Sequence, residues 1–147
     1  MNFPTDDFVV VGEGNFAFGE RLMSRRFVHC VAIVLRGERG ALLVHNQPLQ
    51  TTFPTPDEVR AAIGDVTCGA CILGRHHLSR GTIHFLATLG VPLPNDKVPD
   101  LAADAIPYLH IDADCFDVSY DFAQDALSVR DASAGKILLS NRRITKK

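Results

Sequence analysis

A thiol and an imidazole, those of Cys30 and His45, stand at the outer ends of two apolar segments, residues 31–35 and 41–45. The segment between them, Arg-Gly-Glu-Arg-Gly at 36–40, is charged and rich in glycine. This pattern predicts a β-hairpin with both side chains at its open end. A neutral imidazole within hydrogen-bond reach of a thiol can take its proton and leave a thiolate nucleophile. The two residues therefore predict nucleophilic catalysis by Cys30 with His45 as its base.

The register of the hairpin decides whether the two side chains can meet. A four-residue loop at 36–39 would place Cys30 directly opposite His45, with Cβ atoms about 4.5–5.5 Å apart. A regular five-residue loop would send the two side chains to opposite faces unless a bulge restored the register. Without catalysis, Cys30 would be a small buried hydrophobe and His45 a polar residue at a strand end.

Several segments resemble the CheD family of chemoreceptor glutamine deamidases. Residues 10–18, Val-Val-Gly-Glu-Gly-Asn-Phe-Ala-Phe, are similar to the family's opening V-G-x-G-E-x-A-V stretch. Residues 30–35, Cys-Val-Ala-Ile-Val-Leu, resemble the strand after its nucleophilic cysteine, and His45 matches its catalytic histidine. Ser24 occupies the place of a threonine that supports this histidine. Residues 84–92 resemble the helix and G-I-P segment of the family's second half.

The resemblance implies an activity and a substrate class. Bacterial toxins of the cytotoxic necrotizing factor group share this Cys-His architecture and deamidate a glutamine of host GTPases. By this resemblance Cys30 attacks a glutamine carboxamide, His45 acts as general base and then general acid, and Ser24 orients His45. The implied partner is a protein with an exposed glutamine, either a chemoreceptor or a GTPase-like protein. No metal or organic cofactor is implied.

Two departures from the family pattern leave an alternative open. Val28 and His29 stand where the family has Gly-Ser before the cysteine, and the H-x-M-L-P phrase is His-Asn-Gln-Pro-Leu at 45–49. These positions shape the oxyanion site and the substrate groove. A diverged, non-catalytic CheD-like binding or regulatory domain is therefore the alternative function.

Composition sets broad limits on the class of protein. A chain of 147 residues with 46% hydrophobic and 22% charged residues is typical of one globular domain, here spanning 1–147. Its 15 basic and 17 acidic residues give a net charge of −2, which offers no support for a nucleic-acid partner. No segment approaches the roughly 18 apolar residues of a membrane span. We expect four reduced cysteines and a cytoplasmic protein, with secretion as an effector without a cleavable signal peptide left open.

Strands outnumber helices along the chain, so the fold class is α+β. The resemblance implies two packed, mainly antiparallel or mixed β-sheets flanked by two or three helices. Helices are expected at 56–63, with a Thr55 cap and a Glu58 capping box, and at 78–89. Residues 92–107 are expected to form a loop and residues 141–147 a frayed basic tail. Strands are expected at 8–11, 16–18, 27–35, 41–46, 66–73, 106–111, 116–120, 127–130 and 137–140.

A zinc site is one further possibility. Cys68 and Cys71, followed by His76 and His77, have the spacing of zinc ligands, with Cys115, Asp112 or Asp114 as candidates for completing the set. However, residues three apart on a strand point to opposite faces. The expected strand at 66–73 therefore argues against this site.

A nucleotide-type binding site is another possibility. Residues 12–19 are similar to the glycine-rich first loop of S-adenosylmethionine-dependent methyltransferases. That function requires a helix after the glycines and an acidic residue about 20 positions on, at the end of a second strand. Glu38 has about that spacing but falls in the expected hairpin turn.

Overall fold

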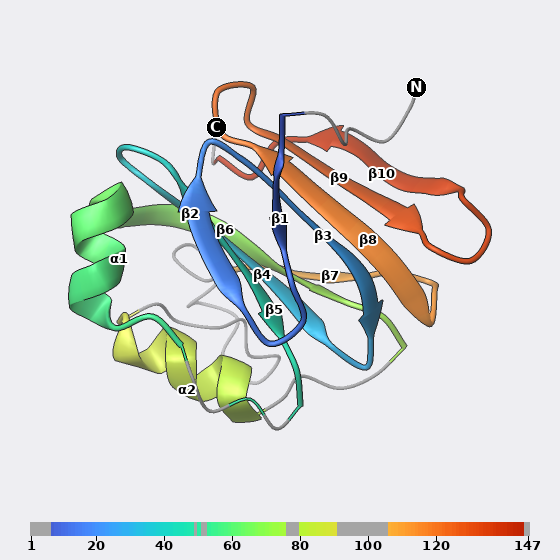
Figure 1. Cartoon of the computed structure of the whole chain (residues 1–147), viewed down its shortest axis with the longest axis horizontal. Coiled ribbons are helices and arrows are strands. Elements are labelled where there is room, and N and C mark those ends of the chain that lie inside the picture. The colour runs from blue at the N-terminus through green and yellow to red at the C-terminus, as the bar shows by residue number, and fades with distance from the viewer. Residues whose placement is uncertain (1–6, 49, 51–52, 76–79, 91–105, 146–147) are drawn as a thin grey trace.

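Two five-stranded β-sheets make up the body of this computed structural model, which describes residues 7–48, 50, 53–75, 80–90 and 106–145 (Figure 1). The first sheet has the strand order β1-β3-β8-β9-β10, and the second has the order β2-β5-β4-β6-β7. The strands are β1 (Val9–Val11), β2 (Phe16–Gly19), β3 (Arg21–Val28), β4 (Val31–Gly37), β5 (Ala41–Asn46), β6 (Val66–Leu73), β7 (Tyr108–His110), β8 (Cys115–Asp121), β9 (Ala126–Asp131) and β10 (Ile137–Arg142); the helices are α1 (Pro56–Ile63) and α2 (Arg80–Thr88).

The predicted α+β class is confirmed, and both sheets are mixed. The pairs β1–β3 and β6–β7 are parallel, whereas the other neighbouring strands are antiparallel. The α1 helix begins and ends as its sequence predicts. The Thr55 hydroxyl accepts a hydrogen bond from the backbone N–H of Glu58, the Glu58 carboxylate accepts one from the backbone N–H of Thr55, and Gly64 ends the helix with a positive φ.

The position of β4 in the fold explains why residues 31–35 are all apolar. Ala32 and Val34 point into a core between the two sheets, while Val31, Ile33 and Leu35 point into a second core. Both helices contribute to that second core, so they cover the outer face of the second sheet (Figure 1). A strand buried on both faces has no polar side, which is why these residues do not alternate.

Two expectations about the chain are wrong. Residues 27–35 are not one strand, because the chain turns at His29 and passes from β3 in the first sheet to β4 in the second. His29 therefore does not lie on a strand; it is exposed in a left-handed turn with φ of 56°. The basic tail is also more ordered than expected, since residues 137–142 form β10 and the residues after it bind Asp125.

The loop at 92–107 and the start of the helix at 78–89 fall largely outside the described residues, as do His76 and His77. Neither α1 nor α2, the helices of the described chain, has the length and apolar character that a bilayer-spanning helix needs.

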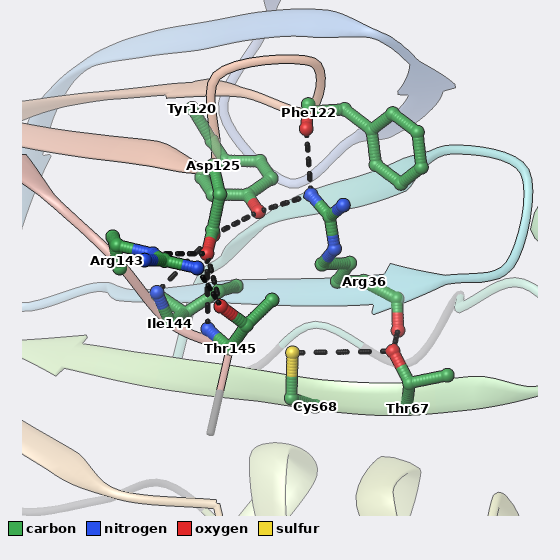
Figure 2. A network of polar contacts seen from close by, with 9 residues as sticks. All are labelled: Arg36, Thr67, Cys68, Tyr120, Phe122, Asp125, Arg143, Ile144 and Thr145. Carbon is green, nitrogen blue, oxygen red and sulfur yellow. Dashed lines mark hydrogen bonds and ion pairs between the residues drawn. The ribbon is translucent and has the colours of Figure 1, made fainter. Parts of the chain in front are cut away.

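The C-terminal segment is bound at the same end of the two-sheet sandwich as the β4–β5 turn (Figure 2). Asp125 accepts hydrogen bonds from the Tyr120 hydroxyl at 2.7 Å, the Thr145 hydroxyl at 2.5 Å and the backbone N–H groups of Ile144 and Thr145 at 3.2 Å. Arg36, from the second sheet, donates to Tyr120 at 2.9 Å. The network therefore connects the two sheets and the C-terminal segment.

We expect Asp125→Asn to destabilise the fold in a pH-dependent way. Burial acts to raise the pKa of Asp125, but the hydrogen bonds from Thr145, Tyr120 and Ile144 outweigh it and lower the pKa to about 2. Because the folded pKa lies below the unfolded value of 3.8, this stabilisation is present above pH 3.8 and is lost as the pH falls towards 2. The variant should lose about 2 kcal/mol of unfolding free energy at pH 7.

Urea unfolding of both proteins at pH 7 and at pH 2.5 checks this expectation. The difference between wild type and Asp125→Asn should shrink at the lower pH. A difference that stays constant across this range would show that the charge of Asp125 is not what stabilises the C-terminal segment.

Candidate active site

Cys30 lies at the point where the chain crosses from one sheet to the other. It follows the left-handed turn at His29 and immediately precedes β4. Its side chain packs in the core between the sheets together with Ala32, and the residue is only 5% exposed. The thiol donates a hydrogen bond to the carbonyl of Val28 at 3.2 Å.

His45 reaches the same core from β5. The register pairs Ala32, rather than Cys30, with His45, and it leaves the four residues 37–40 as the loop. The predicted loop at 36–39 is therefore displaced by one residue. The residue of β5 that faces each position of β4 is therefore two places further along the chain than expected. Since side chains alternate between the two faces of a strand, a shift of two leaves Cys30 and His45 on the same face, as diagonal neighbours. The expected shared face is confirmed and the direct pairing is wrong.

A β-bulge in β3 supplies two more side chains to this face. Ser24 pairs with Val118 and Phe27 with Phe116, so three steps along β3 correspond to two along β8. In a regular strand, residues 24 and 27 would point to opposite faces. The extra residue, with Arg26 at φ of 59°, brings both side chains into contact with His45.

Hydrogen bonds fix the proton arrangement of His45. The Ser24 hydroxyl donates its one proton to the carbonyl of Val11 at 2.5 Å. Its oxygen lies 2.7 Å from Nδ1 of His45, so it accepts a hydrogen bond from Nδ1–H. The proton therefore resides on Nδ1, and Nε2 carries the lone pair. The resemblance implies that Ser24 orients His45, and this direct contact supports that role.

Nε2 of His45 is buried and has no hydrogen-bond partner among the residues that the structure describes. The thiol of Cys30 therefore does not hydrogen-bond to Nε2 in this structure. Catalytic hydrogen bonds are often long in apo active sites and tighten in the substrate complex. A buried ring nitrogen is costly to leave without a partner, so its lone pair is available to a group that approaches from the Cys30 side.

Two phenyl rings hold the imidazole in its plane. Phe27 stacks on His45 with ring centroids 3.8 Å apart and 10° between the planes. Phe116 in turn stacks on Phe27, with centroids 5.1 Å apart. The side chain of His45 therefore has little freedom to rotate away from the face that it shares with Cys30.

Both groups of the pair are neutral at pH 7. Burial raises the pKa of the Cys30 thiol, a hydrogen bond with the backbone of Val28 opposes this rise, and the carboxylate of Glu13 adds to it. Burial lowers the pKa of His45 to about 4, although Glu13 acts in the opposite direction. The site therefore holds a thiol and a neutral imidazole, so a proton must move from sulfur to nitrogen as the thiol attacks.

A pocket of about 410 Å³ opens beside the thiol. Its lining includes Cys30, Val28 and residues that follow β5. His45 is fully buried and is not part of this lining. A substrate group can thus approach the sulfur from the pocket while the imidazole stays buried, away from water.

Two of the candidate zinc ligands considered in the sequence analysis, Cys68 and Cys71, do not converge. Cys68 and Cys71 lie in the regularly paired part of β6 and point to opposite faces, as expected. Cys71 packs in the core beneath the helices, where burial raises its pKa to about 12. No group of three or more metal-ligating side chains occurs among the described residues. All four cysteines are thiols rather than disulfides.

The nucleotide-type site also lacks its required local structure. The glycines at 12–14 form a turn that leads into the strand β2, where a phosphate-binding site requires a helix N-terminus. Glu38 lies in the β4–β5 turn, as expected.

Comparison with known proteins adds no family assignment: no protein-family model matches this chain, and no curated protein matches it.

Proposed function

We propose that this protein is a cysteine-dependent amidohydrolase that converts a protein glutamine to glutamate. One observation carries the proposal: Ser24 holds the proton of His45 on Nδ1, so that a buried, unpartnered Nε2 lone pair shares a face with the Cys30 thiol. A general base for thiol attack needs this tautomer. The resemblance to CheD deamidases supports the choice of glutamine as the substrate.

The reaction needs only these groups and one water molecule. As the Cys30 sulfur attacks the carboxamide carbon, a C–S bond forms and the thiol proton passes to Nε2 of His45. His45 then gives that proton to the departing nitrogen, the C–N bond breaks, and ammonia leaves a thioester. Water, deprotonated by His45, attacks the thioester; the C–S bond breaks and the proton returns to sulfur. Backbone N–H groups at residues 28–30 are our candidates for binding the oxyanion.

A diverged binding or regulatory domain is the second candidate function. Val28 and His29 replace Gly-Ser before the nucleophile, and burial raises the pKa of the Cys30 thiol. Both observations would suit a site that has kept its shape and lost its chemistry. Under either function, we expect a cytoplasmic protein, or an effector, with a protein partner and no required cofactor.

The test of the proposed function is mass spectrometry of candidate protein substrates, including chemoreceptor cytoplasmic fragments and small GTPases. Incubation with the wild-type protein should convert one glutamine of a true substrate to glutamate. Cys30→Ala should abolish this conversion, whereas the control Cys115→Ala should retain it. Conversion that persists in Cys30→Ala would contradict the mechanism. Stoichiometric binding of a partner without conversion would favour the diverged binding domain.

A further inference from the structure

Glu13 brings a negative charge to the pocket beside Cys30. It belongs to a turn over residues 12–15, closed by a hydrogen bond from Asn15 N–H to the carbonyl of Gly12 at 3.1 Å. Gly14 N–H donates to the carbonyl of His45, and His45 N–H donates to the carbonyl of Asn15, both at 3.0 Å. The backbone of the base therefore positions the turn that carries Glu13.

The side chain of Gln47 fixes the carboxylate further. Its Nε2 donates a hydrogen bond to Glu13 Oε2 at 3.2 Å. A Cβ atom at Gly14 would lie 2.8 Å from Oε1 of Gln47, and Gly14 has a φ of +71°. Glycine at this position thus permits both the turn and the packing of Gln47 against it. Glu13 is held at the rim of the pocket by contacts on two sides.

No other described residue of the lining carries a charge, since the remaining ones are Val28, Cys30, Gln47, Pro48 and Gln50. The carboxylate of Glu13 acts on both reacting groups and raises the pKa of each, although burial has the larger effect on both. Its negative potential therefore extends over the position where a substrate carbonyl group would meet the sulfur.

We propose that Glu13 makes this pocket selective for a neutral carboxamide over a carboxylate. This inference rests on the proposed function and adds a specificity residue to it. Hydrolysis of the side chain, R–CONH₂ + H₂O → R–COO⁻ + NH₄⁺, replaces a neutral group by an anion and a cation. Glu13 admits the glutamine, repels the glutamate that forms and attracts the ammonium ion. For the same reason, the site suits glutamines with neutral or basic neighbours and disfavours those flanked by acidic residues.

Two small alkylating agents test this selectivity without any protein substrate. Iodoacetamide carries the carboxamide of glutamine and iodoacetate carries the carboxylate of glutamate; each forms a C–S bond to Cys30 and releases iodide. The measured quantity is the ratio of the two rates at Cys30, determined by peptide mass spectrometry. Because both reagents need the same thiolate, a change in the pKa of Cys30 cancels in the ratio. Half-buried Cys115 on β8, whose charged neighbours are Arg26, Asp117 and Asp131 rather than Glu13, serves as an internal reference.

At low ionic strength, we expect the iodoacetamide-to-iodoacetate ratio at Cys30 to exceed that of free cysteine by about three- to fivefold. Glu13→Gln should bring it close to the value for free cysteine, as should high salt. The control Glu20→Gln, which removes an exposed carboxylate at the opposite end of β2, should leave the ratio unchanged. The ratio at Cys115 should not respond to Glu13→Gln.

A ratio that is the same in wild type and Glu13→Gln would overturn the inference. So would a Cys30 that reacts with neither reagent while Cys115 reacts with both, because the pocket would then not admit even a small amide. Failure of the proposed function looks different. In that case the ratio responds to Glu13→Gln as expected, while no substrate glutamine is converted by the wild-type protein.

Discussion

His45→Gln should lower the rate of glutamine conversion by about 10²- to 10⁴-fold, the range lost when a general base is removed. Glutamine keeps much of the volume of histidine beneath Phe27, so the fold should survive. Its amide nitrogen and oxygen cannot accept a proton from a thiol at neutral pH. Because burial raises the pKa of Cys30, the thiol left behind should be less reactive than an ordinary cysteine.

Alkylation of the four cysteines at pH 7 measures this effect independently of any substrate. In the wild-type protein, we expect Cys30 to react faster than Cys68, Cys71 and Cys115. In His45→Gln, Cys30 should become slower than the partly exposed Cys68 and Cys115. The control His110→Gln changes an exposed histidine on β7 and should have no effect. Equal rates at Cys30 in wild type and His45→Gln would show that His45 is not its base.

The same base should give the activity an unusual pH dependence. Burial lowers the pKa of His45 to about 4, so the imidazole stays neutral, and able to accept a proton, down to about that pH. An ordinary histidine, with a pKa near 6.5, would be mostly protonated at pH 5. We therefore expect conversion by the wild-type protein to change little between pH 7 and pH 5. A loss of activity centred near pH 6.5 would mean that His45 is accessible to water during the reaction.

The sequence predicted the shared face of Cys30 and His45 better than the strands that position them. Cys30 and His45 stand out because they end two apolar runs. An even number of residues in the hairpin loop was enough to place their side chains on one face. The exact loop was wrong by one residue because Gly37 and Gly40 both suit a turn, and local residues do not decide between two such registers. The Gly37 N–H to Gly40 carbonyl bond closes the observed loop.

The strand β3 shows where sequence reasoning had too little information. Residues 21–26, Arg-Leu-Met-Ser-Arg-Arg, have neither a clean alternation nor a continuous apolar run, so no strand was predicted over these residues. The bulge interrupts the alternation, and the residue that stabilises it, Asp117 on β8, is distant from it in the sequence. Ser24 was found only through its position relative to Cys30, and Phe27 was not recognised as part of the site.

Asp117 is the residue that we expect to maintain this bulge. It is buried, with a side chain that is 4% exposed. One carboxylate oxygen accepts the backbone N–H of Arg26 at 2.9 Å, within the bulge itself. The other accepts two hydrogen bonds from the guanidinium of Arg130, at 2.6 and 3.0 Å. A left-handed arginine costs about 1 kcal/mol, which the bond to Asp117 helps to offset.

Asp117→Ala should therefore affect both the fold and the site. It leaves Arg130 without its carboxylate in a partly buried position and the N–H of Arg26 without its acceptor, so we expect a loss of about 3 kcal/mol in unfolding free energy. Without the bulge, β3 would revert to regular alternation, and Ser24 and Phe27 could not both face His45. Alkylation of Cys30 at pH 7 should then fall relative to that of Cys68.

Two further variants separate positioning from a general loss of stability. Asp117→Asn keeps an oxygen for the N–H of Arg26 and removes the charge, so it should remain unstable yet recover most of the Cys30 reactivity. Asp125→Asn destabilises the sandwich through the C-terminal segment and should leave Cys30 reactivity unchanged under conditions where the protein is folded. If Asp117→Asn and Asp117→Ala slow Cys30 equally, then the ion pair with Arg130, and not the hydrogen bond to the bulge, keeps Ser24 and Phe27 against His45.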